Sequence, residues 1–272
     1  MLAGIIQLSS TRDVERNLQK SNELAEQAAK QGASWLLYPE NAPYLGKDRE
    51  KLSVAEPIDG PIVDAYREIA SKHGCWVTLG SFPEKSPSPD HTYNTQLLIQ
   101  PDGEIASVYR KMHLFDVELE DGTILEESAS ILGGDVIETA MVEADGESFC
   151  VGLSICYDLR FPEFYRELRA RGAHVLTVPA AFTLQTGREH WHALLRARAI
   201  ENQCYVLAPD QWGYHFAGRA SFGQSVAYDP WGRMLGCAPE RECAFVVELD
   251  MPSLESVRKK MPCWTHRKLP SR

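Results

Sequence analysis

The 272-residue sequence lacks three features, and each absence narrows the class of protein. No apolar run reaches the roughly 18 residues that a membrane span needs, so we expect no membrane association. Basic residues are in the minority, and the net charge of -10 disfavours a nucleic-acid partner. The seven cysteines contain no Cys-x-x-Cys pair, which argues against a zinc site or a disulfide framework and favours a reduced, cytoplasmic setting.

The residues that are present suffice for a large buried core, because 44% of the positions are hydrophobic. The length by itself allows one large domain or two small ones. The apolar opening stretch, Met1–Ile6, has no basic lead, and it predicts a first β-strand rather than a signal peptide.

The two halves of the sequence repeat one pattern. Gly32–Pro39 and Gly172–Pro179 each follow a helix end and combine a glycine cap, a short apolar strand and a closing proline. Three further pairs of segments match in the same order: Gly4–Leu8 with Gly152–Cys156, Cys75–Leu79 with Cys204–Ala208, and Leu97–Ile105 with Val226–Met234. Four ordered matches argue against chance similarity.

Helices are expected between these strands. The apolar spacing over residues 14–28 and 62–69 places the hydrophobic side chains on one helical face. Further helices are predicted near Pro162–Arg171 and His190–Asn202. Each half therefore alternates strands and helices, and two such halves can stack sheet on sheet. The prediction is an α/β fold, a four-layer α-β-β-α sandwich built from two similar halves.

Three reactive residues follow predicted strands: Glu40, Lys111 and Cys156. In α/β folds, ligands gather at the carboxyl ends of strands. Taken singly, these residues have ordinary structural explanations as a solvated carboxylate, an exposed amine and a small buried hydrophobe. Taken together, they supply a base, a fixed cation for a developing oxyanion and a nucleophile, which is what thiol chemistry on an amide requires.

Cys156 has the local sequence of a reactive cysteine, because Pro162 downstream fits the first turn of a helix. A thiol that faces a helix N-terminus beside Lys111 is predicted to have a lowered pKa. Cys75 and Cys204 begin equivalent strands and are predicted to lie in the core.

Three ordered motifs carry a resemblance to a known family. The segments Tyr38–Asn41, Tyr109–Asp116 and Ser154–Glu163 resemble motifs of the nitrilase superfamily, and the resemblance extends from Gly4 to His266. It implies an αββα sandwich in a single domain over residues 1–272, hydrolysis of non-peptide C–N bonds, and no metal or organic cofactor. We also expect a small-molecule amide as substrate and a homodimer or higher homo-oligomer.

The resemblance also implies roles for individual residues. Glu40, Lys111 and Cys156 correspond to a catalytic triad, and by position Glu127 is a second acidic residue that positions it. Without the family, Glu127 would be interpreted as a solvated loop carboxylate. The implied mechanism has Glu40 take the thiol proton, while Lys111 and the backbone N–H of Tyr157 hold the oxyanion. Water then hydrolyses the thioester.

Two further segments narrow the resemblance within the superfamily. Pro179–Gly187 and His190–Glu201 are similar to segments of the omega-amidase and deaminated glutathione amidase branches. The second branch, whose members release 2-oxoglutarate and cysteinylglycine, is favoured by Gln203–Val206, by Gln211, Gly213, His215, Arg219 and Ser221, and by the tail Pro262–Arg267. Three residues depart from that branch and bear on the substrate rather than the chemistry: Asp210, Trp212, and Gln224 in place of His.

The oxoacid carboxylate of such a substrate needs a cationic partner. Arg160 is the candidate, because a guanidinium can grip a carboxylate through two hydrogen bonds. The alternative for Arg160 is a structural ion pair. By analogy with the family, Phe182 and Thr186 line the same pocket. The leaving group is expected to extend toward solvent near Gln211–Arg219, beside Gln224.

Three functions remain open at this point. They are deaminated glutathione amidase, a neighbouring amidase acting on 2-oxoglutaramate or a carbamoyl amine, and a catalytically silent binding protein. The intact set of Glu40, Lys111 and Cys156 argues against the third. His190 and His192 are two residues apart and do not share a helix face, so they are interpreted as surface or packing residues rather than metal ligands.

Overall fold

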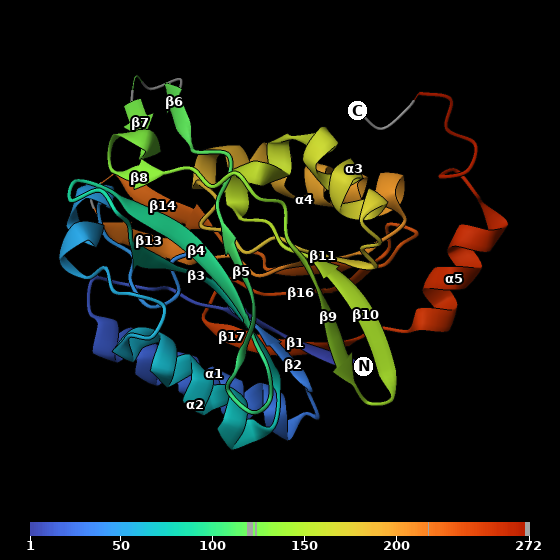
Figure 1. Ribbon diagram of the computed structural model, residues 1–272, viewed down its shortest axis with the longest axis horizontal. Coiled ribbons are helices and arrows are strands. Elements are labelled where there is room, and N and C mark those ends of the chain that lie inside the picture. The colour runs from blue at the N-terminus through green and yellow to red at the C-terminus, as the bar shows by residue number, and fades with distance from the viewer. Residues whose placement is uncertain (119–121, 123, 217, 270–272) are drawn as a thin grey trace.

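The computed structural model describes residues 1–118, 122, 124–216 and 218–269, and its helices and sheets form four layers (Figure 1). Helices α1 (Val14–Lys30) and α2 (Pro61–His73) cover the outer face of one sheet. Helices α3 (Pro162–Ala170) and α4 (Leu184–Asn202) cover the outer face of the other. The predicted α-β-β-α sandwich is therefore confirmed. Helix α5 (Met251–Lys260) lies at one edge of the layers.

Among the described residues, the first sheet contains seven strands, and its last strand in chain order comes from the second half of the chain. Strands β1, β2 and β3 run parallel to one another, and β4 and β5 continue antiparallel. Strand β17 pairs with the outer edge of β1, and β8 pairs with β4. The strands are β1 (Leu2–Gln7), β2 (Trp35–Leu37), β3 (Trp76–Lys85), β4 (Thr92–Ile99), β5 (Ile105–Arg110), β8 (Ile131–Leu132) and β17 (Cys243–Glu248).

The second sheet repeats this plan, so the predicted similarity of the two halves is confirmed. Its strands β10, β11 and β12 are parallel, β15 and β16 follow antiparallel, and β9 pairs with the outer edge of β10. The strands are β9 (Thr139–Ala144), β10 (Glu147–Gly152), β11 (Val175–Thr177), β12 (Tyr205–Ala208), β15 (Val226–Tyr228) and β16 (Met234–Cys237).

Short elements surround one end of the two sheets. Two ribbons are β6 (Asp116–Glu118) with β7 (Ile124–Glu126), and β13 (Trp212–Phe216) with β14 (Arg219–Phe222). The part of the chain that the structure describes also contains the 3₁₀ helices η1 (Asp48–Ser53), η2 (Glu127–Ala129) and η3 (Cys156–Arg160). These elements carry several of the residues that line the site described below.

The repeat extends to single side chains. The Sγ of Cys75, just before β3, donates to the carbonyl of Ala33 at 3.0 Å. The Sγ of Cys204, just before β12, donates to the carbonyl of Ala173 at 3.1 Å. Both cysteines are buried, so their predicted place in the core is confirmed. In each half, the thiol ties the start of the third parallel strand to the turn before the second.

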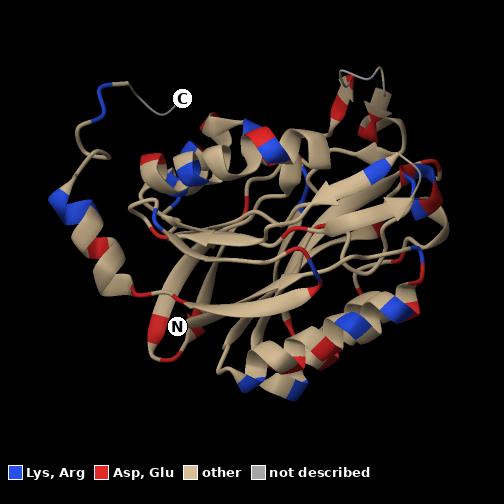
Figure 2. Ribbon diagram, turned by 180° about the vertical axis from the view of Figure 1, so that it is seen from behind, with Lys and Arg blue, Asp and Glu red and all other residues tan. Residues whose placement is uncertain are grey.

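Two buried clusters fill the spaces between the layers. The larger cluster combines both sheets with α3 and α4, and it includes Trp35 and Leu37 from the first sheet and Val151 and Leu176 from the second. The smaller cluster lies between the first sheet and helices α1 and α2. Many of the charged residues lie along the helices that cover the two sheets (Figure 2). Within the described part of the chain, no helix is long and apolar enough to cross a membrane.

Two predicted boundaries in the second half are wrong. The strand expected over Gly152–Cys156 lies earlier in the chain, as β10. The chain has left the sheet at Cys156, which donates its N–H to the carbonyl of Pro179 at 2.9 Å and begins η3. The helix expected from His190 begins at Leu184, because a largely polar first turn hides the apolar periodicity.

Candidate active site

The segments that follow β2, β5 and β10 meet beside a cavity of about 480 Å³. Four of the side chains predicted from the sequence line this cavity: Glu40, Lys111, Glu127 and Cys156. They come from four separate segments, so only the tertiary fold brings them together. The volume falls in the range of about 300–1,000 Å³ that is typical of small-molecule sites.

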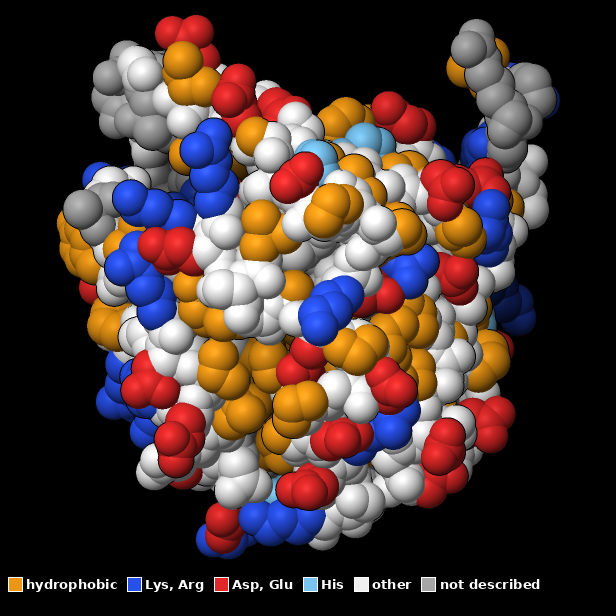
Figure 3. Space-filling model, turned by 60° about the vertical axis from the view of Figure 1, so that its left-hand side comes forward, with side chains coloured by type: hydrophobic (Ala, Val, Ile, Leu, Met, Phe, Trp, Pro, Cys, Tyr) orange, Lys and Arg blue, Asp and Glu red, His pale blue; other side chains and the backbone are white. Residues whose placement is uncertain are grey.

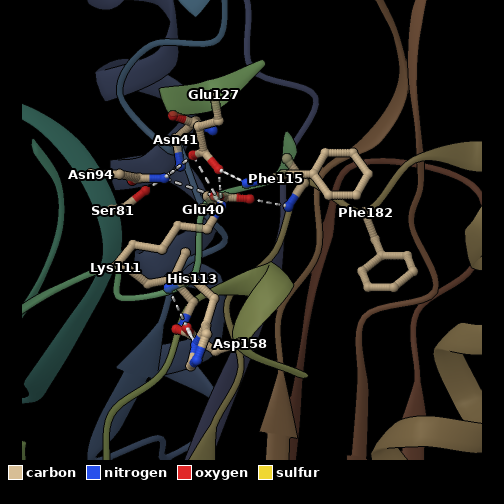
Figure 4. A network of polar contacts seen from close by, with 12 residues as sticks. Glu40, Asn41, Ser81, Asn94, Lys111, His113, Phe115, Glu127, Asp158 and Phe182 are labelled. Atoms are coloured by element: carbon tan, nitrogen blue, oxygen red, sulfur yellow. Dashed lines mark hydrogen bonds and ion pairs between the residues drawn. The ribbon is translucent and has the colours of Figure 1, made fainter. Parts of the chain in front are cut away.

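Lys111 lies between two carboxylates. Its Nζ donates to Oε1 of Glu40 at 3.0 Å, and to Oε1 and Oε2 of Glu127 at 3.0 and 2.9 Å (Figure 4). The exposed fractions of Glu40, Lys111 and Glu127 are only 3%, 2% and 6%. Burial by itself would lower the pKa of Lys111, but the two carboxylates outweigh it and raise that pKa well above its usual value. Lys111 is therefore a permanent cation of the site.

Glu40 is held by contacts to both of its oxygens. Its Oε1 also accepts from Nδ2 of Asn94 at 2.8 Å, and its Oε2 accepts the backbone N–H of Ala181 at 2.9 Å. Burial by itself would raise the pKa of the Glu40 carboxyl, but Lys111 and then Lys51 outweigh burial, and the pKa is lowered to about 2. Glu40 is therefore an ionised carboxylate at neutral pH.

Glu127 is buried, so its interpretation as a solvated loop carboxylate is wrong. Its Oε2 accepts the backbone N–H of Phe115 at 2.7 Å, and its Oε1 lies 3.4 Å from Nδ2 of Asn94. Because Asn94 contacts Glu127 and Glu40, it holds both carboxylates beside Lys111. Asn94 was not predicted from the sequence, since a single Asn within strand β4 belongs to none of the motifs.

Cys156 has an uncommon backbone conformation. Its φ of 45° lies in the left-handed region, which non-glycine residues seldom adopt. Cys156 is the first residue of η3, and Tyr157 follows it; the first N–H groups of a helical turn have no partner within the helix. Helix α3 begins only at Pro162, so the element that starts at the thiol is η3 rather than α3.

The predicted lowering of the Cys156 pKa is wrong. Burial, and then the neighbouring Glu40 carboxylate, raise the pKa of the thiol well above its usual value, and Lys111 opposes them only in part. The site therefore presents a protonated thiol beside an ionised base, rather than a preformed thiolate.

Asp158 ties η3 to the segment after β5. Its Oδ2 accepts the backbone N–H of Ile155 at 2.8 Å and the hydroxyl of Tyr109 at 2.7 Å. Its Oδ1 accepts the backbone N–H of His113 at 3.1 Å and lies 2.7 Å from Nδ1 of the same residue (Figure 4). The sequence motifs contain these residues, but their spacing gives no sign that they pair.

Arg160, Phe182 and Thr186 all line the cavity. The guanidinium carbon of Arg160 lies 5.4 Å from the ring centroid of Phe182 and 5.9 Å from that of Tyr157. Its Nη1 lies 3.3 Å from Nδ1 of His190. Among the described residues, no carboxylate lies within 4.0 Å of this guanidinium, so the alternative of a structural ion pair is wrong.

Gln224 faces helix α4, so its expected place beside the leaving group is wrong. Its Oε1 lies 2.6 Å from Nε2 of His192, whose other ring nitrogen lies 2.9 Å from the hydroxyl of Tyr228. His192 is therefore a packing residue, as predicted. Neither Gln224 nor Trp212 belongs to the described lining of the cavity.

Asp210 and Gln211 are outside the described lining of the cavity, but both form hydrogen bonds to residues that line it. Asp210 accepts the backbone N–H of Phe182 at 2.9 Å, and Gln211 is buried and donates to the backbone carbonyl of Glu40 at 3.0 Å. The segment Gln211–Arg219 was predicted to lie beside the leaving group. At its two ends, Arg219 lines the cavity and Gln211 does not.

Comparisons with known proteins show the family to which this chain belongs. Residues 2–259 match the carbon–nitrogen hydrolase family. The chain is 41% identical over 268 residues to a Synechocystis protein named deaminated glutathione amidase, covering 98% of this chain and 97% of that one. A Homo sapiens protein of the same name is 37% identical over 271 residues, with 98% of this chain and 82% of that one covered.

Solved structures resemble the chain over its whole length. The Caenorhabditis elegans NitFhit protein matches with a TM-score of 0.90 and 38% identity, and the match covers 98% of this chain and 65% of that one. Saccharomyces cerevisiae Nit3, a member of branch 10 of the nitrilase superfamily, matches with a TM-score of 0.87 and 29% identity, covering 99% and 97%. Since the family match and these relatives span nearly the whole chain, the protein belongs to the carbon–nitrogen hydrolase family of the nitrilase superfamily and is a hydrolase of non-peptide carbon–nitrogen bonds.

Proposed function

We propose that this hydrolase cleaves a small amide through a thioester on Cys156, and that deaminated glutathione is its substrate. The contact of the Lys111 ammonium with both Glu40 and Glu127, beside Cys156, carries the proposal. The relatives named deaminated glutathione amidase, which cover 98% of this chain, support the choice of substrate.

In the first half-reaction, Glu40 takes the proton of the Cys156 thiol as the sulfur attacks the amide carbonyl carbon. A C–S bond forms, and the carbonyl oxygen becomes an oxyanion. When the oxyanion collapses, the C–N bond breaks and the proton held by Glu40 passes to the departing nitrogen. The enzyme then holds a thioester on Cys156 and an ionised Glu40. The raised pKa of the thiol fits this order, because the proton leaves only when a base accepts it.

In the second half-reaction, water replaces the departed amine. Glu40 takes a proton from the water, whose oxygen attacks the thioester carbonyl carbon. The C–S bond breaks, the carboxylic acid product leaves, and the proton returns from Glu40 to the Cys156 sulfur. One water is consumed in each cycle, and both protein groups return to their starting states.

Lys111 and the backbone N–H of Tyr157 stabilise the oxyanion in both half-reactions. A buried ammonium is worth more here than in water, because little solvent is present to screen it. Glu127 acts by holding Lys111. Both of its carboxylate oxygens accept hydrogen bonds from Nζ of Lys111, and the backbone N–H of Phe115 donates to Oε2 of Glu127. We assign Glu127 a positioning role, since both of its oxygens are paired with Lys111, whereas the charge of Glu40 acts on the thiol.

Arg160 is proposed to bind the carboxylate of the 2-oxoacyl half. Its guanidinium has no carboxylate partner among the described residues and lies over the ring of Phe182 inside the cavity. A planar guanidinium can form two parallel hydrogen bonds with such a carboxylate. Phe182 and Thr186 would then contact the carbon chain of the same half.

The remaining proposals concern the setting in which the enzyme acts. We propose a single domain over residues 1–272, supported by the larger hydrophobic cluster, which combines both halves of the chain. A cytoplasmic location is supported by the cysteines, all seven of which are free thiols. A homodimer or higher homo-oligomer is supported by large apolar side chains that are left exposed on β16 and the turn before it: Trp231, Met234 and Leu235.

The deciding experiment is a substrate panel with the purified protein. Deaminated glutathione, 2-oxoglutaramate and a carbamoyl amine are compared by the release of 2-oxoglutarate, cysteinylglycine and ammonia. We expect the highest kcat/KM for deaminated glutathione, with equal amounts of 2-oxoglutarate and cysteinylglycine. A higher kcat/KM for 2-oxoglutaramate would assign an omega-amidase instead. If neither oxoacid amide is cleaved, the proposed substrate class is overturned.

A further inference from the structure

The cavity is lined by several cationic side chains that have no role in the proposed mechanism. Lys47, Arg49 and Lys51 line this wall together with Arg219 on β14. Asp48 is interleaved with them, and its Oδ1 lies 2.9 Å from Nζ of Lys51. The whole chain has a net charge of -10, so this surplus of cations is local. In Figure 3, Lys and Arg side chains gather on the upper left, at the end of the molecule where Figure 1 places β13 and β14.

Arg219 is joined to the reacting groups through a single residue, Ala181. Its Nη2 donates to the carbonyl of Ala181 at 3.0 Å, while the N–H of Ala181 donates to Oε2 of Glu40 at 2.9 Å. The peptide groups of Ala181 therefore link the Arg219 guanidinium to the Glu40 carboxylate. Among the described residues, no carboxylate lies within 4.0 Å of the Arg219 guanidinium. Since a guanidinium has five N–H donors, Arg219 retains donors for a molecule in the cavity.

Arg160 contacts Phe182, the residue that follows Ala181 in the chain. Its guanidinium lies over the ring of Phe182, whereas that of Arg219 contacts Ala181. Two guanidinium groups without carboxylate partners therefore border one short segment of the cavity wall. A substrate with a carboxylate at each end would satisfy both of them, and one with a single carboxylate would satisfy only one.

We infer that Arg219 and Arg49 form a subsite for a carboxylate on the amine half of the substrate. The inference rests on the proposed function, in which Arg160 holds the acyl half. Lys51 is already paired with Asp48, so Lys47, Arg49 and Arg219 carry the charge that a ligand can match. Of these three, the two guanidinium groups can each form two parallel hydrogen bonds with a carboxylate. The preferred substrates then release an amino acid or a dipeptide with a free carboxylate, rather than ammonia, because complementary charge favours such a leaving group.

The test compares two substrates that share the 2-oxoglutaryl group. One is deaminated glutathione, and the other is the same molecule with its terminal glycine as the neutral amide. The wild-type enzyme should prefer the free acid by about tenfold to a hundredfold in kcat/KM, as expected for a hydrogen bond to a charged group. In Arg219→Gln this preference should fall toward one. Arg241→Gln is the matched control, since it removes an equal charge from an exposed residue outside the cavity lining, and it should keep the wild-type preference.

A second measurement separates this subsite from a general structural effect. Both substrates form the same thioester, so Arg219→Gln should slow its formation from the free acid and leave the rate of thioester hydrolysis at the wild-type value. Rapid mixing followed by an acid quench and mass spectrometry of Cys156 measures both steps. A slower hydrolysis step in Arg219→Gln would overturn the inference, because the amine half has already left.

The outcomes distinguish this inference from the proposed function. If the wild-type enzyme cleaves both substrates with equal kcat/KM, or if Arg219→Gln keeps the preference, the subsite is wrong and the proposed function stands. If neither substrate is cleaved, the proposed function itself fails. Should Arg219→Gln not fold, Arg49→Gln decides, because this side chain is exposed and lines the same wall. An unchanged preference in Arg49→Gln, combined with no loss of preference at high salt, would overturn the inference.

Discussion

Lys111 and Glu40 are 71 positions apart in the sequence, yet Nζ of one lies 3.0 Å from Oε1 of the other, and both side chains are buried. Two buried charges are stable together only if each is neutralised and hydrogen-bonded. Glu127 supplies the second negative charge, and Asn94 donates to Glu40. The cavity therefore holds a fixed cation and an ionised base before any substrate arrives.

Replacing the Cys156 thiol should abolish turnover. In Cys156→Ala, kcat should fall by several orders of magnitude, because Cys156 is the only cysteine among the described residues that line the cavity, and a thioester needs a thiol. The far-UV circular dichroism spectrum and the melting temperature should stay close to those of the wild type. Mass spectrometry of acid-quenched wild-type enzyme should place the acyl group on Cys156. An adduct on a different cysteine, or full activity in the variant, would contradict the assigned nucleophile.

Removing the buried ammonium should impair both catalysis and stability. Lys111→Ala should lower kcat by at least about 10²–10³, the usual loss for one oxyanion donor. It also leaves Glu40 and Glu127 close together without their shared cation, which should destabilise the fold by about 3–5 kcal/mol. Urea titration measures the loss of stability, and steady-state kinetics measures kcat. The control is Lys259→Ala on α5, where an exposed lysine is removed. A folded Lys111→Ala variant with near-normal kcat would refute the proposed role.

Arg160→Lys should change substrate binding more than the chemical step. Lysine keeps the charge but cannot form two parallel hydrogen bonds with a carboxylate, so KM for deaminated glutathione should rise clearly. A small neutral amide should be affected far less, if it is turned over. The measurement is kcat and KM for both substrates in wild type and variant. Equal losses for the charged and the neutral substrate would mean that Arg160 acts on the structure of the cavity instead.

The depressed pKa of Glu40 predicts a specific loss of stability in acid. Because the pKa falls from an ordinary value of 4.5 to about 2 on folding, ionised Glu40 stabilises the folded state above pH 4.5. This contribution should disappear as the pH falls from about 4.5 toward 2. Glu40→Gln, which cannot ionise, should show a shallower decline of unfolding free energy over the same interval. Parallel declines in urea titrations of the two proteins would show that Glu40 is not the responsible group.

The sequence by itself determined the layered fold and the candidates for the reactive groups. Apolar periodicity, glycine caps and the repeated Gly32–Pro39 and Gly172–Pro179 segments are local patterns, and local patterns are set by neighbouring residues. The motifs around Glu40 and Cys156 are also contiguous in the sequence, so both residues were predicted from it. The residue at which the strand before Cys156 ends was not predicted correctly. The turn there depends on a hydrogen bond from Cys156 to Pro179, which follows strand β11 and is distant in the sequence.

Only the tertiary structure decided what state these groups are in. Glu127 looks solvated in a linear reading, and burial against Lys111 and Phe115 makes it part of the site. The pKa of Cys156 was predicted to fall, but it rises, because burial and a neighbouring carboxylate outweigh a single cation. Exposure, pairing and local dielectric depend on groups far apart in the chain, so no local pattern encodes them.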